Sequence, residues 1–97
     1  MILHPVTDLE VVVTPAGQLR LLSPAAGTEM WFQGQDVARW VALRLERGHL
    51  GDAAKMLSDA WGTDLAEVRC EIWAWAHRLW SGGLLQAEQA DEGTAES

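Results

Sequence analysis

The segment DAAKMLSDAWGTDLAEVRCEIWAWAHRLW, residues 52–80, decides the fold class of this chain. In residues 52–61, apolar side chains recur at the i, i+3, i+4, i+7 and i+8 positions of an amphipathic helix. Residues 62–63 form a short turn, and Asp64 can then cap a second helix that runs to the end of the segment, with Glu67 completing a capping-box pair. The segment therefore predicts two helices joined by a brief turn that contains glycine.

A further helix is expected before this segment. It begins after Asp36, which can act as its cap, and Gly48 ends it. Val37, Val41 and Leu45 lie at the i, i+4 and i+8 positions, so we expect them to face the core.

Three short extended segments precede the helices. Residues 9–14 are rich in β-branched side chains, residues 18–22 alternate between polar and apolar, and residues 28–32 again favour a strand. Turn signals of glycine and proline separate them. This order predicts an α+β domain of winged helix-turn-helix form, in which a three-stranded antiparallel sheet is followed by three helices.

Charge is unevenly distributed along the chain. The formal net charge is −7, and residues 86–97 hold four acids and no base, which leaves ten acids and seven bases elsewhere. We expect residues 86–97 to be a disordered acidic tail, because a polar segment cannot offset the entropy of ordering. Residues 1–8 are expected to be an N-terminal extension and residues 9–85 the domain. An acidic domain argues against a nucleic-acid partner, since such proteins present a basic stripe.

The residue types that carry catalysis or bind metals are scattered. Cys70 is the only cysteine, which excludes an intrachain disulfide. His4, His49 and His77 lie in different elements and lack metal-ligand spacing with one another or with Cys70. We expect no catalytic residue, no metal, no cofactor and no enzyme activity. Without a secretory signal or an apolar run of about 18 residues, a cytoplasmic protein with no membrane partner is expected.

Two rows of side chains lie next to each other on the predicted third helix. The row expected to face the core comprises Leu65, Val68, Ile72, Trp75 and Leu79. The second row comprises Arg69, Trp73, Ala76 and Trp80, with His77 at its margin. One interpretation of the second row is a partly exposed aromatic shelf, with Arg69 stacked on Trp73 and the small Ala76 leaving a depression. The alternative is that these aromatic side chains simply pack where they fit.

The third predicted strand offers another surface. If residues 28–32 form an edge strand, their unpaired N–H and C=O groups can accept an extended peptide. Met30 and Phe32 share one face, which we expect to point inward, while Glu29 and Trp31 share the other. Many edge strands bind nothing, so the pattern alone leaves both interpretations open.

Over about residues 9–85, the chain resembles the PqqD-like family, also called RiPP recognition elements. The family's Leu-x-x-x-Gly-Leu-Leu signature is matched by LWSGGLL at residues 79–85, and its acidic-aliphatic pair by Glu71-Ile72. The order of three strands and three helices also matches. Phe32-Gln33 replaces the family's usual Leu-Asn pair and the first helix is about one turn longer, so the register of the third strand and the start of that helix stay open.

The resemblance implies a non-catalytic peptide chaperone. It would bind the leader of a ribosomally synthesised precursor peptide as an added strand and deliver it to a modifying enzyme, such as a radical enzyme, a cyclase or a protease. The implied peptide-binding residues are Glu29, Met30, Trp31, Phe32, Arg69, Trp73, Ala76 and His77. Whether the domain forms a homodimer is left open.

The alternative is a winged-helix DNA-binding regulator or a protein-interaction adaptor. The third helix disfavours DNA, because Glu67 and Glu71 would repel phosphates and a base-reading helix needs polar or basic residues near its N-terminus.

Overall fold

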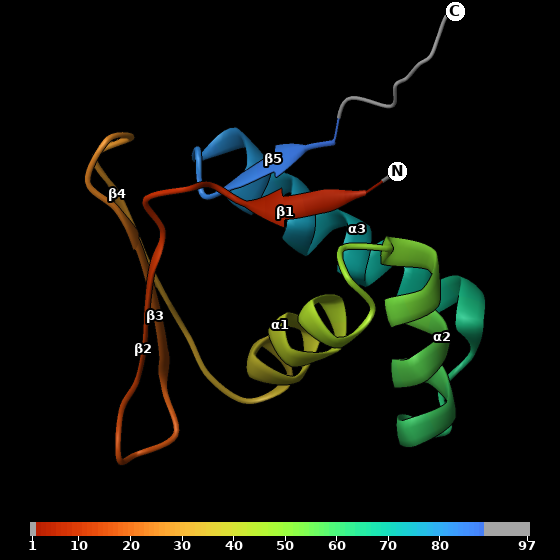
Figure 1. Ribbon diagram of the computed structural model, residues 1–97. Coiled ribbons are helices and arrows are strands. Elements are labelled where there is room, and N and C mark those ends of the chain that lie inside the picture. The colour runs from red at the N-terminus through yellow and green to blue at the C-terminus, as the bar shows by residue number, and fades with distance from the viewer. Residues whose placement is uncertain (1, 89–97) are drawn as a thin grey trace, which may run out of the picture.

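The computed structural model describes residues 2–88 of the chain. Its elements in chain order are β1 (Leu3–Pro5), β2 (Glu10–Val13), β3 (Leu19–Ser23), β4 (Thr28–Phe32), α1 (Gln35–Leu45), α2 (Leu50–Trp61), α3 (Leu65–Ser81) and β5 (Leu85–Ala87). The predicted three-stranded antiparallel sheet followed by three helices is confirmed, with strand order β2-β3-β4. Figure 1 shows this sheet standing to one side of the helices.

The pleat of the sheet separates a core face from an outer face. Leu19 pairs with Phe32 and Leu21 with Met30, so these four side chains share the face that packs against the helices. Leu19 and Leu21 of β3 are fully buried, whereas every residue of β2 is exposed. The helices therefore cover β3 and β4, and β2 extends beyond them.

A second, two-stranded sheet joins the two ends of the described chain. β1 pairs antiparallel with β5, and the two strands lie side by side in Figure 1. Leu3 and Leu85 contribute to the core from this sheet. This pairing places part of the expected N-terminal extension and residues 86–87 of the expected tail in a sheet, which main-chain bonds and the buried side chain of Leu3 hold against the domain. The rest of the expected tail, residues 89–97, lies outside the described residues.

α1 differs from its prediction in both its start and its buried face. It begins after Gly34 and not after Asp36, and Asp36 instead pairs with Arg39 one turn further on. Val41 and Leu45 are 48% and 65% exposed, so of the predicted apolar stripe Val37 packs against the core and these two residues do not. The bulky side chain of Trp40, on the neighbouring face of α1, determines which side of the helix is buried. The buried residues of α1 are Trp40, Ala42 and Leu43.

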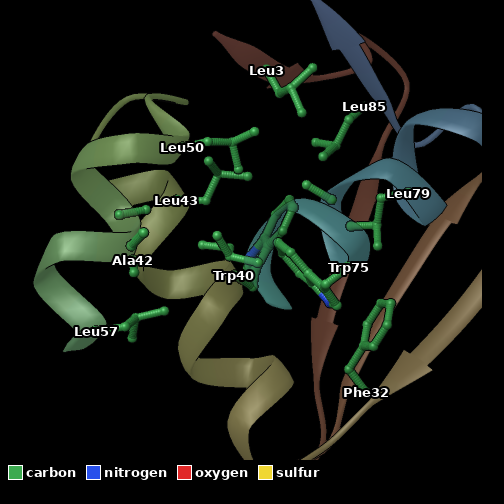
Figure 2. Close-up of a cluster of buried hydrophobic side chains, with 14 of the residues drawn as sticks. Leu3, Phe32, Trp40, Ala42, Leu43, Leu50, Leu57, Trp75, Leu79 and Leu85 are labelled. Atoms are coloured by element: carbon green, nitrogen blue, oxygen red, sulfur yellow. The ribbon is translucent and has the colours of Figure 1, made fainter. Parts of the chain in front are cut away.

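The turn between α2 and α3 follows its sequence signals. Gly62 adopts the left-handed conformation, with φ of 65°, and ends α2. The side chain of Asp64 accepts a hydrogen bond from the Glu67 N–H at the start of α3. Leu65 is partly exposed, but the other four members of the predicted core row are buried: Val68, Ile72, Trp75 and Leu79. In Figure 2, Trp75 lies between Trp40 and Phe32 at the centre of the core.

Candidate functional site

β4 is an edge strand. It pairs with β3 along one side, and within residues 2–88 no strand pairs with its other side. In an antiparallel ladder, alternate residues of an edge strand direct their N–H and C=O groups outward. The five residues of β4 therefore present main-chain donors and acceptors that an extended chain could pair with.

The four predicted site residues of β4 alternate as expected. Met30 is partly buried against the core, and Phe32 is 8% exposed. Glu29 and Trp31 point to the outer face, where Trp31 is 54% exposed. A strand added to β4 would thus extend an apolar core face and an outer face that carries Glu29 and Trp31.

The outer face is organised around the Glu29 carboxylate. Glu29 Oε2 accepts hydrogen bonds from Arg20 Nε at 2.7 Å and from Trp31 Nε1 at 2.8 Å. The guanidinium of Arg20 also lies 5.7 Å from the centroid of the Trp31 ring. The hydrogen bond from Arg20 lowers the pKa of Glu29. Desolvation raises this pKa by a smaller amount, and the hydrogen bond from Trp31 lowers it further. Glu29 thus holds Trp31 in place while keeping its negative charge.

Arg20 was not predicted as part of the site, although its position contains a usable signal. The register of the sheet pairs Arg20 with Trp31, which places their side chains on the same face. The β3–β4 register is therefore the signal in the sequence that identifies this pair.

Two contacts define how β4 lies against α3. The rings of Phe32 and Trp75 meet edge to face, with their centroids 6.0 Å apart. At the other end of β4, a Cβ built on Gly82 would lie 2.9 Å from Met30 Cε and 3.3 Å from Thr28 Cγ2. Because Gly82 follows Trp75 in the chain while Met30 precedes Phe32, β4 runs in the opposite sense along the C-terminal part of α3.

These contacts identify which flank of α3 faces β4. At about 100° per residue, residues spaced three and four apart share one side of a helix. Further along the same side, Glu71 Oε1 lies 3.5 Å from Nη2 of Arg39 on α1. We call this side the β4-side flank; it comprises Glu71, Ala74, Trp75, Arg78 and Gly82. Its exposed members are Glu71, Ala74 and Arg78.

The aromatic side chains of the second predicted row lie on a different side of α3. Ring centroids of Trp73 and His77 are 6.4 Å apart, and those of His77 and Trp80 are 6.3 Å apart. We call these three residues the aromatic flank. Trp73 is nine residues from Gly82, which places it about 180° around the helix from the contact with β4. The aromatic flank is exposed in part, with Trp73 at 44%, but it does not face β4.

The predicted site is therefore only partly assembled. The structure brings the four β4 residues together, but it places Arg69, Trp73 and His77 away from that strand. Ala76 is fully buried, so the predicted surface depression is wrong. The predicted stacking of Arg69 on Trp73 is also absent from residues 2–88, where the arginines over tryptophan rings are Arg20 and Arg39. The physical reason is that periodicity defines two flanks beside a core row without telling which one meets the sheet.

Other kinds of site find little support in the part of the chain that the structure describes. No group of three or more His, Cys, Asp or Glu side chains within residues 2–88 could hold a metal ion. Cys70 is an exposed free thiol. None of the helices at these positions is long and apolar enough to cross a bilayer.

Comparison with known proteins gives one informative likeness. No family model matches the chain, and no curated protein matches it. Among solved structures, the chain is similar to one described as lasso peptide synthetase B1 complexed with the leader peptide, with a TM-score of 0.68 and 23% sequence identity. The match covers 90% of this chain and 100% of that one. At this level of identity the likeness shows a shared fold.

Proposed function

We propose that this chain is a non-catalytic domain that binds the leader region of a ribosomally synthesised precursor peptide as an added antiparallel strand on β4. One observation carries the proposal: among residues 2–88, β4 is open along one side and lies beside α3. The shared fold with a protein solved together with a leader peptide supports the same assignment. The LWSGGLL segment and the Glu71-Ile72 pair support membership of the PqqD-like recognition elements.

The sheet has a second open edge at β2, and the two edges differ in their surroundings. β2 is exposed on both faces along its whole length, so a strand added there would gain little besides main-chain pairing. A strand added to β4 would lie between Met30 and Phe32 on one side and the β4-side flank of α3 on the other. Main-chain bonds then supply affinity, and alternate side chains supply selectivity.

The expected affinity follows from the length of β4. About five main-chain hydrogen bonds would each contribute about 0.5–1.5 kcal/mol. One or two buried anchor side chains would add about 2 kcal/mol each. Ordering a flexible peptide subtracts part of this sum. A dissociation constant between about nanomolar and tens of micromolar is therefore expected.

In this proposal the domain performs no bond chemistry. It holds the leader in an extended form and presents the attached precursor to a modifying enzyme, such as a radical enzyme, a cyclase or a protease. The enzyme would act on the part of the precursor that β4 does not hold.

The decisive experiment is amide hydrogen exchange on the isotopically labelled full chain. The probe is a synthetic peptide that corresponds to the N-terminal region of a short precursor encoded beside the gene. We expect slower exchange at residues 28–32 and unchanged exchange at residues 10–13, which serve as an internal control on the other edge. Unchanged exchange at both edges, or equal protection of the two, would contradict the proposal.

Salt dependence separates this function from DNA binding. Neutralisation of phosphates makes DNA affinity fall steeply with salt, whereas strand addition responds weakly. Calorimetry at low and high salt, with the peptide and with a DNA duplex, therefore distinguishes the two. Tight, strongly salt-dependent binding of the duplex would favour the regulator alternative.

A further inference from the structure

We infer that the β4-side flank selects peptides that carry an acidic side chain, and that Arg78 is the residue that binds it. This inference rests on the proposed function and adds the chemical class of the ligand.

The two charged residues of this flank are in different states. Glu71 shares the guanidinium of Arg39 with Asp36, so its carboxylate already has a cationic partner within the protein. The guanidinium of Arg78 forms no ion pair within residues 2–88 and is exposed. Glu71 and Arg78 are seven residues apart, which is about 10 Å along the helix axis. That separation is about one Debye length at physiological ionic strength, so Glu71 neutralises Arg78 only weakly.

Arg78 lies between the two residues of this flank that contact β4. Trp75, which meets Phe32, precedes it by three residues, and Gly82, which meets Met30, follows it by four. An added strand would lie about 4.8 Å from β4, within reach of the long arginine side chain. An aspartate or glutamate of the peptide could then accept charge-assisted hydrogen bonds from the guanidinium.

Ala74 gives the expected peptide a second feature. It lies one turn before Arg78 and is exposed, and its methyl group leaves room for a larger apolar side chain. Four residues of helix rise about 6 Å, while two residues of strand rise about 6.6 Å. An apolar and an acidic side chain two positions apart in the peptide therefore match the spacing of Ala74 and Arg78.

The net charge of the protein disfavours acidic peptides. With a formal charge of −7, the chain as a whole attracts basic peptides and repels acidic ones. A preference for an acid at a fixed position must therefore come from a local cation. Arg69 is the matched control, because it is an exposed arginine of the same helix without an ion pair in the described chain, on the side away from β4.

The first test uses a display library of random 12-residue peptides, selected on the wild type, on Arg78→Glu and on Arg69→Glu. Wild-type and Arg69→Glu proteins should enrich peptides with Asp or Glu two positions from an aliphatic residue. Arg78→Glu should instead enrich Lys or Arg at that position. Loss of the acid preference in both variants, or in neither, would overturn the assignment of Arg78.

The second test measures one enriched peptide by calorimetry. Arg78→Gln should weaken its binding about fivefold and Arg78→Glu at least tenfold, since a partly exposed ion pair has this magnitude. Replacing the peptide's acid by lysine should restore binding to Arg78→Glu, while Arg69→Gln should stay within about twofold of wild type. Unchanged affinity in both Arg78 variants, with folding verified by circular dichroism, would also overturn the inference.

The two proposals fail in different ways. If no enriched peptide slows amide exchange at residues 28–32, the proposed function fails. If enriched peptides protect these residues but show no acid preference, strand addition stands and the role of Arg78 is wrong.

Discussion

Phe32 and Trp75 meet edge to face in the core, with their ring centroids 6.0 Å apart and their ring planes at 65°. Phe32 is the last residue of β4, and Trp75 lies in the middle of α3 (Figure 2). The contact thus joins the open strand to the helix beside it. Because both rings are buried, the position of the edge depends on how the core is packed.

The first prediction concerns this aromatic pair. Phe32→Ala should lower the free energy of unfolding by about 3–5 kcal/mol, because it removes a buried ring and leaves a cavity against Trp75. Urea denaturation followed by tryptophan fluorescence measures the change. Trp31→Ala is the matched control on the adjacent, exposed position and should cost about 1 kcal/mol or less. Similar costs for the two variants would show that Phe32 does not anchor β4.

The second prediction concerns the close approach of Gly82 to Met30. Gly82→Ala should lower the free energy of unfolding by about 1 kcal/mol, since the new methyl group displaces the end of the Met30 side chain. Gly51→Ala should instead raise it by about 0.5 kcal/mol, because alanine lowers the entropy of the unfolded chain and its Cβ meets open space within α2.

A double-mutant cycle tests whether Met30 is the cause. In a Met30→Ala background, Gly82→Ala should lose most of its destabilising effect, because the clashing atom is gone. Additive effects of the two substitutions would show that the backbone of α3, and not Met30, opposes the methyl group.

The third prediction concerns Asp8 and the turn before β4. The Asp8 carboxylate accepts hydrogen bonds from the Ala25 N–H at 2.8 Å and from Ser23 Oγ at 2.9 Å. The bond from Ala25 has the larger effect, and both bonds lower the pKa of Asp8 in the folded state. Stability from this group is therefore present above the unfolded pKa of about 3.9 and is lost as pH falls through the folded pKa.

The measurement is urea denaturation between about pH 6 and about pH 3. The wild type should lose more stability over this range than Asp8→Asn, whose side chain does not titrate. The lowered pKa of Glu29 contributes to both proteins, so the difference between them isolates Asp8. Parallel pH profiles would show that the Asp8 contacts contribute nothing.

The sequence predicted what depends on local periodicity and caps. The bounds of β4, the cap at Asp64 and most of the core row of α3 were predicted correctly, since each follows from neighbouring residues. The buried face of α1 was not, because Trp40 outweighs the regular spacing of Val41 and Leu45. The pairing of β1 with β5 was missed because the two strands lie at opposite ends of the chain.

The same distinction divides the candidate site. Its strand half could be predicted because inward and outward side chains alternate along β4, a pattern that is visible in the sequence alone. Its helix half depends on which flank of α3 meets the sheet, and the contact of Gly82 with Met30 decides this. The prominent tryptophans of α3 drew attention to the aromatic flank, whereas the flank beside β4 consists of ordinary residues such as Ala74 and Arg78.

The last prediction distinguishes these two flanks directly. Ala74→Trp places a large ring where an added strand would lie and should weaken binding of a leader peptide by tenfold or more. Trp73→Ala removes the exposed ring of the aromatic flank and should leave affinity within about twofold, because Trp73 lies about 180° around α3 from the β4 contact. Both residues are exposed, so both variants should fold, and calorimetry with one peptide compares them. From the sequence, Trp73 was expected among the peptide-binding residues and Ala74 was not. If Trp73→Ala weakens binding tenfold while Ala74→Trp still binds, the peptide lies on the aromatic flank and the β4 edge is not its site.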